Sequence, residues 1–303
     1  MKNHDSPLKA YDILFTGVVG VSFAAILIRY ASAPAGIIAF YRLFFAALLT
    51  LPYTILYQHR TLSSLKQKEL LLAVLSGIFL AMHFYTWIKS LELTTIASST
   101  VLVSLQPVFT MVLGYLLYQE TLQKVSMVGM AAAIFGSIMM GISDLKLDHA
   151  HLIGDLLALS GGFFGSCYII IGRKLRNSVP AATYCTLVYG ICAITLLLIN
   201  LVLRTPLRGY GTNNLLIFLA LAVICTIGGH SIFNWSLKHL KAVTVSTASL
   251  GEPIGATLLA YLLFRESPGT MQLLSGSIIL FGLYLFLKGI VGQRPSINHN
   301  DAD

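Results

Sequence analysis

The sequence contains little charge. Only 11% of its 303 residues are Asp, Glu, Lys or Arg, whereas 56% are hydrophobic. Average soluble domains carry roughly 25% charged residues, so a surface of this composition could not face water on all sides. The charges fall in short clusters between long apolar runs, which excludes an ordinary soluble fold. The composition therefore predicts an integral membrane protein in contact with a lipid bilayer.

Signatures of cofactor and nucleotide chemistry are also missing. The sequence has no Walker A loop, dinucleotide fingerprint, HExxH pair, paired CxxC or nucleophile elbow. The net charge of +8 comes without a basic stripe, which argues against nucleic acid as a partner. We expect no cofactor and no bound metal. We interpret the four cysteines as small core residues, because they lie in apolar runs without metal-ligand spacing. They are Cys167, Cys185, Cys192 and Cys225.

Ten apolar runs come close to the length that a membrane-spanning helix needs, about 20 residues. The fifth and tenth are short, and the connections carry most of the turn and charge residues. The sequence therefore predicts an all-α integral membrane protein with ten transmembrane helices. The runs cover residues 11–28, 35–57, 70–88, 95–118, 125–141, 152–172, 181–203, 215–237, 243–264 and 271–287.

Lysine and arginine are distributed unevenly across this bundle. Cytoplasmic loops of membrane proteins carry the excess of these residues, so their distribution orients the chain. We expect both termini in the cytoplasm and the protein in the bacterial inner membrane. With the N-terminus inside, thirteen of the 20 lie on the inner side: Lys2, Lys9, Arg60, Lys66, Lys68, Lys124, Arg173, Lys174, Arg176, Lys238, Lys241, Lys288 and Arg294. The outer side holds Arg29, Lys89, Lys146, Arg204, Arg208 and Arg265.

The two halves of the chain repeat each other. Residues 106–120 (QPVFTMVLGYLLYQE) and 252–266 (EPIGATLLAYLLFRE) share a proline, a Tyr-Leu-Leu triplet and a final glutamate at the same places. Each half holds five predicted helices, an odd number, so the second copy enters the membrane upside down. We predict two inverted five-helix repeats over residues 11–141 and 152–287. Such repeats are typical of secondary transporters, with the site near the midplane.

On these residues the chain resembles the EamA-type transporters of the drug/metabolite transporter superfamily. The matching features are the Phe40-Tyr41-Arg42 entry to the second predicted helix, the passage from Trp87 to Pro107, and the Pro…Tyr-Leu-Leu…Glu segment of both halves. The resemblance implies a ten-helix exporter or importer of amino acids, related metabolites or toxic compounds. It also implies a central cavity lined by helices 1, 3, 4, 6, 8 and 9, with helices 5 and 10 at the periphery.

A few polar side chains lie well inside the predicted spans. Ionisable groups cost roughly 2.5–3.5 kcal/mol near a helix centre on insertion scales, so each needs a reason. The candidates for a substrate or ion pathway are Arg42, His83, Gln106, His230, Asn234 and Glu252. A structural interpretation stays open beside this one: packing for the histidines, an ion pair or phospholipid contact for Arg42, and helix–helix glue for the other polar groups.

Glu252 is the group that we tie most closely to transport. An acid in an apolar span could exchange a proton for substrate, which makes the proton the expected coupling ion. Its carboxylate could instead bind a substrate's ammonium group. His230 lies at similar depth and is the expected cationic neighbour of Glu252. Gln106 occupies the matching place in the first half, with nearly the same shape and no charge.

Two prolines, Pro107 and Pro253, fall in the middle of the predicted fourth and ninth helices. A proline inside a helix removes a backbone donor and frees the carbonyl four residues earlier, so each predicts a kink. Because the kink recurs in both halves, we expect it to serve gating.

Other landmarks lie near the ends of the predicted spans. We interpret Trp87 and Trp235 as aromatic-belt residues at the two membrane surfaces, rather than as substrate contacts. We expect the acidic residues there to be solvated or to cap helices. They are Asp12, Asp155, Glu120 and Glu266.

Secondary transport is the function that these features predict. Without an ATPase domain, the driving force must come from an ion gradient, exchange or the substrate's own gradient. Paired kinked helices suit alternating access by a carrier, and we expect no enzyme. The family resemblance implies that the carrier moves small metabolites such as amino acids, and we predict that it exports them. An intramembrane lipid-modifying enzyme using His and Glu, and a passive pore, are the alternatives left open.

Overall fold

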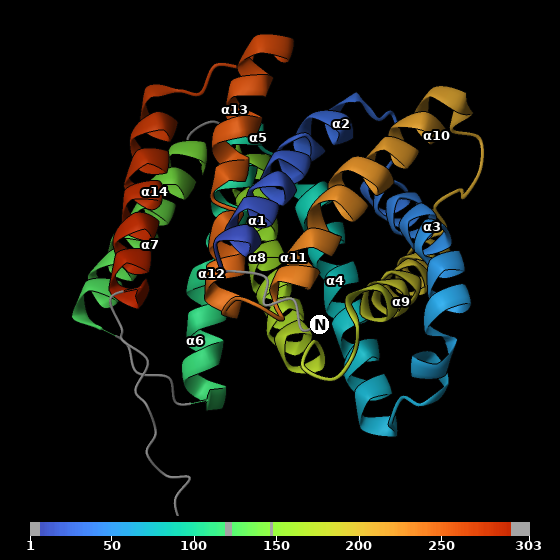
Figure 1. Cartoon of the computed structure of the whole chain (residues 1–303). Helices are drawn as coiled ribbons and strands as arrows, with labels where there is room; N and C mark the ends of the chain where they lie inside the picture. Colours follow the sequence, from blue (N-terminus) through green and yellow to red (C-terminus); the bar gives the residue numbers. More distant parts are fainter. Residues whose placement is uncertain (1–6, 119–122, 146–147, 292–303) are drawn as a thin grey trace, which may run out of the picture.

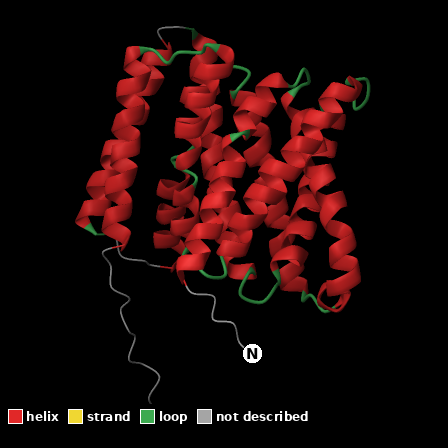
Figure 2. Cartoon of the chain, turned by 45° about the horizontal axis from the view of Figure 1, so that its top comes forward, coloured by secondary structure: helices red, strands yellow, loops and turns green. Residues whose placement is uncertain are grey.

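The structure is a computed structural model that describes residues 7–118, 123–145 and 148–291. All regular structure in these ranges is helical, and the helices stand side by side as a bundle (Figures 1 and 2). The elements are α1 (Pro7–Ser22), α2 (Ala24–Tyr30), α3 (Ala35–Ser63), α4 (Gln67–Ser90), α5 (Ile96–Val103), α6 (Gln106–Tyr118), α7 (Lys124–Leu145), α8 (His149–Leu175), α9 (Ala181–Val202), α10 (Gly211–Ala220), the π-helix η1 (Leu221–His230), α11 (Ser231–Ser236), α12 (Ala242–Ala248), α13 (Gly251–Phe264) and α14 (Thr270–Val291).

Eight helical stretches are long and apolar enough to cross a membrane. Two more apolar helices, Lys124–Met140 and Thr270–Phe286, are shorter. The expected multi-pass helical architecture is therefore present, while the number of ten crossings stays a prediction. The eight stretches are Ala10–Tyr30, Ala35–Ser63, Gln67–Ser90, Ile96–Leu117, His149–Leu175, Ala181–Val202, Gly211–Ser236 and Ala242–Phe264.

The bundle has two ends that differ in which connections they carry. The described chain begins in α1 and ends in α14 on the same side, which we call the terminal side (Figure 2). The opposite side, called the far side, carries the connections after α2, α4 and α13. The helices α7 and α14 form a pair at one edge of the bundle (Figure 1). Their close approach depends on glycine, because a Cβ added to Gly282 would lie 2.6 Å from the backbone nitrogen of Ala133.

The fourth and ninth predicted spans are each interrupted by a two-residue turn. α5 ends at Val103 and α6 begins at Gln106, while α12 ends at Ala248 and α13 begins at Gly251. The structure thus has a two-residue turn just before Pro107 and Pro253, where kinks are expected, and each span continues across its turn as one stretch, Ile96–Leu117 and Ala242–Phe264. The physical reason is that the first turn of a helix needs no N–H from its residues, so a proline fits there without distorting the half-helix that it begins.

The span from α10 to α11 widens into a π-helix, η1. The hydroxyl of Thr226 donates to the carbonyl of Leu221 at 3.2 Å, and that of Ser231 donates to the carbonyl of Thr226 at 3.3 Å. The backbone N–H of Ser231 also donates to the Thr226 carbonyl, and this reach of five residues between backbone groups is the spacing of a π-helix. Such segments are rare and are frequent at functional sites. This one ends at His230, in the middle of the bundle.

Candidate functional site

A narrow cavity lies in the centre of the bundle, between α2, α3, α4, α8, η1, α11 and the two interrupted spans. The space open to the centres of water-sized molecules is about 40 Å³, which is room for a few waters. In this conformation the cavity is therefore narrow. Its polar lining consists of Arg42, His83, Ser104, Gln106, Tyr168, His230, Asn234, Ser246, Ser249 and Glu252.

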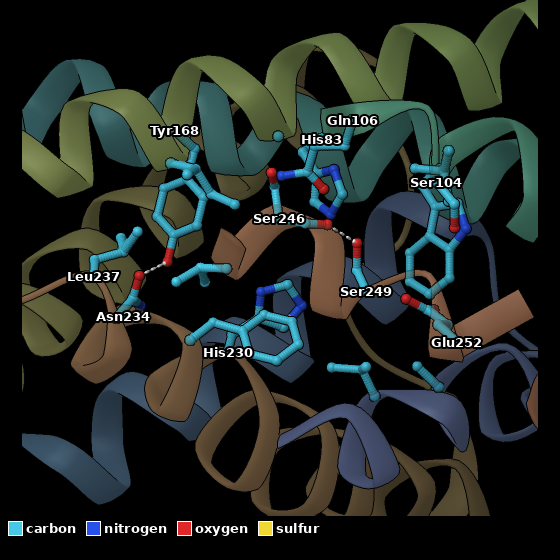
Figure 3. Close-up of a pocket in the computed structure, with 18 of the residues that line it drawn as sticks. His83, Ser104, Gln106, Tyr168, His230, Asn234, Leu237, Ser246, Ser249 and Glu252 are labelled. Atoms are coloured by element: carbon cyan, nitrogen blue, oxygen red, sulfur yellow. Dashed lines mark hydrogen bonds between the residues drawn. The ribbon is translucent and has the colours of Figure 1, made fainter. Parts of the chain in front are cut away.

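All six residues predicted for the pathway line this one cavity. The Tyr168–Asn234 pair lies at one end, Ser104 and Glu252 lie at the other, and His83 and His230 lie between them (Figure 3). Residues from both halves of the chain thus meet at a common centre. Their part in transport remains a proposal.

Arg42 is fully buried, with 0% of its surface exposed, where α3 meets η1 and α4. Its Nε donates a hydrogen bond of 2.8 Å to the hydroxyl of Thr226. Its guanidinium carbon lies 4.3 Å from the centre of the Phe84 ring, an arrangement that stabilises a cation through the ring's negative face. Both terminal nitrogens, Nη1 and Nη2, are buried without a hydrogen-bond partner in the described chain. The geometry holds the group in place and leaves its two outermost nitrogens unsatisfied.

Glu252 begins the first turn of α13, where the helix N-terminus favours negative charge. Its backbone N–H donates to the carbonyl of Ser249 at 3.0 Å, which tightens the turn before the helix. Within the described residues its carboxylate has no hydrogen bond and lies in no ion pair of 4.0 Å or less, with either Arg42 or His230. The cavity therefore holds a guanidinium and a carboxylate that do not satisfy each other.

The two predicted histidines approach each other in the middle of the cavity, with ring centres 6.2 Å apart. Nδ1 of His83 lies 2.8 Å from the carbonyl of Gly161, so this nitrogen carries the proton and donates. The His230 ring rests against Phe84, with 5.1 Å between ring centres. A Cβ on Gly165 would lie 2.9 Å from Nδ1 of His83, so a glycine is what lets α8 approach this point.

Asn234 closes the cavity at the terminal side. Its Oδ1 accepts a hydrogen bond of 2.6 Å from the Tyr168 hydroxyl, and its Nδ2 donates to Cys185 Sγ at 3.3 Å and to the Tyr189 hydroxyl at 3.4 Å. Its backbone carbonyl accepts from Arg176 Nε at 3.0 Å. Because protein groups engage both ends of the amide, Asn234 shapes the cavity wall and ties α11 to α8 and α9.

A latch of side chains closes the far side, joining the end of α2 to the end of α13. Arg29 Nη2 lies 3.6 Å from Glu266 Oε2, and the rings of Tyr30 and Phe264 pack with centres 4.9 Å apart. The other Glu266 oxygen accepts the backbone N–H of Ile96 at 2.8 Å, at the start of α5. Glu266 thus caps a helix, as expected, and the helix that it caps, α5, belongs to the other half of the chain. We call these contacts the far-side latch.

Two expectations about span ends were wrong. Trp87 is only 3% exposed and lines the cavity, stacked on His83 with ring centres 6.2 Å apart, so it is no aromatic-belt residue. Asp155 is 2% exposed and accepts from the Thr94 hydroxyl at 3.1 Å, so it is not solvated. Distance along an apolar run does not tell which face of a helix a side chain occupies. Glu120 lies outside the described residues.

Sequence reasoning also missed cavity residues. Tyr168 and Ser104 carry no signal beyond a polar group in an apolar run. Phe84, which contacts the Arg42 guanidinium from outside the cavity lining, has the sequence pattern of an ordinary core residue. The contact between Arg42 and Thr226 joins positions 184 residues apart, which a single sequence does not reveal.

Comparison with known proteins gives relatives among transporters. A protein from Salmonella typhimurium named "Probable amino-acid metabolite efflux pump" is 28% identical over 200 residues, which is 63% of this chain and 67% of that protein. A protein of the same name from Escherichia coli is 27% identical over 194 residues, 61% of this chain and 65% of that protein. The matched part of the chain thus spans about two thirds of the length of these relatives.

A protein of known crystal structure shares the fold. Its sequence is 18% identical, and the TM-score is 0.65 over 94% of this chain and 99% of that one. Two stretches of the present chain, residues 8–142 and 152–288, match the model of the EamA-like transporter family. Together these stretches cover most of the chain, which is a multi-pass helical protein and belongs to the EamA-like transporter family.

Proposed function

We propose that the protein is a secondary transporter that exports small metabolites of the amino-acid class across the bacterial inner membrane. The observation that carries this proposal is the central cavity, which buried Arg42 and partly buried Glu252 line without pairing with each other. Intramembrane charges of this kind mark substrate and ion pathways. The amino-acid class rests on the printed names of the two relatives.

Alternating access by two inverted five-helix repeats, over residues 11–141 and 152–287 with ten crossings in all, is the proposed mechanism. Three observations support it. The family model matches the chain twice, the fourth and ninth predicted spans are interrupted at matching places, and His83 and His230 meet at the centre. In such transporters one repeat rocks against the other around a fixed midplane site. The narrow cavity suits a carrier better than a passive pore, and the transporter relatives argue against an enzyme.

The terminal side faces the cytoplasm in this proposal, so the far-side latch faces outward. The described cations support this orientation, because the terminal side carries Arg60, Lys66, Lys124, Arg173, Lys238 and Lys241. A single cysteine at the exposed Ser64 should react with an impermeant reagent only from the inside, and one at the exposed Asn213 only from the outside. Labelling of Ser64 from the outside would overturn the orientation.

Glu252 is the proposed coupling group, with a proton as the ion. Purified protein in proteoliposomes tests the function directly. A panel of amino acids and related metabolites should include at least one compound whose labelled form accumulates by saturable counterflow, and an imposed pH gradient should drive it. Flux that rises linearly with concentration would point to a pore, and the absence of counterflow for every compound would contradict the proposal.

A further inference from the structure

We propose that Arg42 is the receptor for a carboxylate on the transported compound, and that Glu252 receives its cationic group. The cavity then selects amphoteric metabolites, which carry both charges. This inference rests on the proposed transport function and assigns the chemistry of recognition to two named side chains, which face the same cavity from α3 and α13.

The contacts of Arg42 leave one part of its guanidinium for a ligand. Nε is engaged by Thr226, and the flat face lies over the Phe84 ring. Nη1 and Nη2 remain, buried and unpartnered in the described chain. Two guanidinium nitrogens with parallel N–H bonds match the two oxygens of a carboxylate, which makes this pairing bidentate and specific. Because the protein already holds the plane and the inner edge of the group, the outer edge is oriented before a ligand binds.

The charge of Arg42 favours an anionic ligand at the site. Arginine keeps its proton in proteins, so this side chain is cationic even when it is buried. A buried cation is costly unless it is paired, and neither Glu252 nor another described acid lies in an ion pair with it. Ring contact with Phe84 and one hydrogen bond offset only part of that cost. A bound carboxylate supplies the missing partner.

The rest of the lining separates a carboxylate-bearing zwitterion from a simple anion. Glu252 would repel an anion that carries no positive group, and it would attract an ammonium. Trp87 also lines the cavity, and the face of an indole ring attracts a cation. Inorganic anions and anionic lipid headgroups fit Arg42 alone, whereas an amino-acid-like compound satisfies both charges at once.

Transport by the wild-type protein tests this without any mutation. The twenty amino acids and a set of carboxylate-free metabolites, including nucleosides and polyamines, are first tested by counterflow in proteoliposomes. Each amino acid that moves is then compared with its amide and with its decarboxylated amine, which are nearly the same size. We expect the free acid to move at least about 10-fold faster than either analogue, as loss of a bidentate charged contact requires.

Two variants assign the effect to Arg42. Arg42→Lys keeps the charge and loses the fork, so the KM of the free acid should rise about 10- to 100-fold and the preference for acid over amide should collapse. Thr226→Val removes the partner of Nε, keeps the side-chain shape, and should raise KM by a smaller factor. Arg176→Lys is the matched control, because this other buried arginine donates to the carbonyls of Asn234 and Val179 and lies outside the cavity lining. Any loss in that control should be equal for acid and amide.

The outcomes separate this inference from the function on which it rests. Transport of an acid and its amide at equal rates, or transport confined to carboxylate-free compounds, would overturn the inference and leave the transporter function intact. An unchanged preference for acid over amide in Arg42→Lys would overturn it as well. Failure of every compound to show counterflow would instead overturn the proposed function, and the inference with it.

Discussion

The two interrupted spans of the bundle are alike in sequence and differ in how they are held. At the first, before Pro107, the Gln106 carbonyl accepts hydrogen bonds of 2.8 Å from Ser166 and 2.9 Å from Thr110. The carbonyl of Val103, which Pro107 frees, lies 2.9 Å from where a Cβ on Gly162 would be, so backbone packs on backbone. This break is fixed against α8.

At the second interruption, before Pro253, the neighbours are side chains. A Cβ on Gly251 would meet Val18 Cγ1 at 2.5 Å, and one on Gly255 would meet Ser22 Oγ at 2.9 Å, both on α1. Glu252 has no partner for its carboxylate in the described chain, whereas the matching Gln106 is neutral and packed against α8. Two copies of one motif therefore have different roles, one in structural support and one in providing a charged group. The first copy is fixed against the backbone of α8. The second copy carries the charge and packs on side chains of α1, so we predict that it is the one that moves during transport.

Exchange of the carboxyl of Glu252 and the amide of Gln106 tests the division of charge and has the largest expected effect. Glu252→Gln should lower pH-driven transport by at least about 10-fold or remove its dependence on the pH gradient, because the only ionisable group of the pair is lost. Gln106 shows that an amide fits at a break of this kind, so the variant should reach the membrane in normal yield.

The reverse change, Gln106→Glu, is the matched control for that exchange. It adds a carboxyl to the anchored break and should not restore pH dependence to Glu252→Gln. Unchanged transport and unchanged pH dependence in Glu252→Gln would leave Glu252 as a structural residue and end the coupling hypothesis.

Replacement of each proline tests whether the second break is the one that moves. An alanine in place of Pro253 adds an N–H that can bond to the Ser249 carbonyl and continue the helix through the break. We expect Pro253→Ala to slow counterflow several-fold with near-normal yield. Pro107→Ala should have a weaker effect, because Ser166 and Gly162 hold the first break from outside. Equal rates for both variants and the wild type would remove gating from the account.

Two glycine substitutions sharpen the difference in packing and have the smallest effect on transport. Gly162→Ala places a Cβ 2.9 Å from a backbone oxygen that cannot rotate away, so it should destabilise the protein by about 1–3 kcal/mol. Gly251→Ala meets one side chain, Val18, and no backbone atom, and it gains helix propensity, so it should cost less. Thermal unfolding in detergent should therefore show a clearly lower Tm for Gly162→Ala alone. A larger drop for Gly251→Ala would reverse the assignment of anchored and mobile breaks.

The sequence predicts most of the helical architecture, but it predicts little about which polar groups contact each other. Apolar runs and the repeated Pro…Tyr-Leu-Leu…Glu segment place the helices and the two breaks, because hydropathy and proline chemistry act locally. The polar residues of the cavity are also predictable, since an ionisable group in an apolar span needs a reason to be there. Which groups meet is a tertiary matter: Arg42 with Thr226, and Glu266 with the start of α5, join residues far apart in the chain.

Errors in the prediction have the same origin. Trp87 and Asp155 lie near the ends of apolar runs, and the sequence gives depth along a helix without the direction in which a side chain faces. The π-helix η1 adds a second uncertainty, because its wider spacing shifts the side chains that follow Thr226 relative to an ordinary helix. The resulting encounter of His83 with His230 was visible only in the structure.

Accessibility of the cavity from the two sides of the membrane tests the central claim most directly. Ser246 lines the cavity, and its hydroxyl donates to the carbonyl of Val243 in its own helix, so a single cysteine fits there. In a variant with the four native cysteines replaced by serine, Ser246→Cys should react with impermeant reagents from either side of oriented vesicles. Added substrate should shift the ratio of the two rates in opposite directions. Reaction from one side only, or no reaction with and without substrate, would contradict alternating access around this cavity.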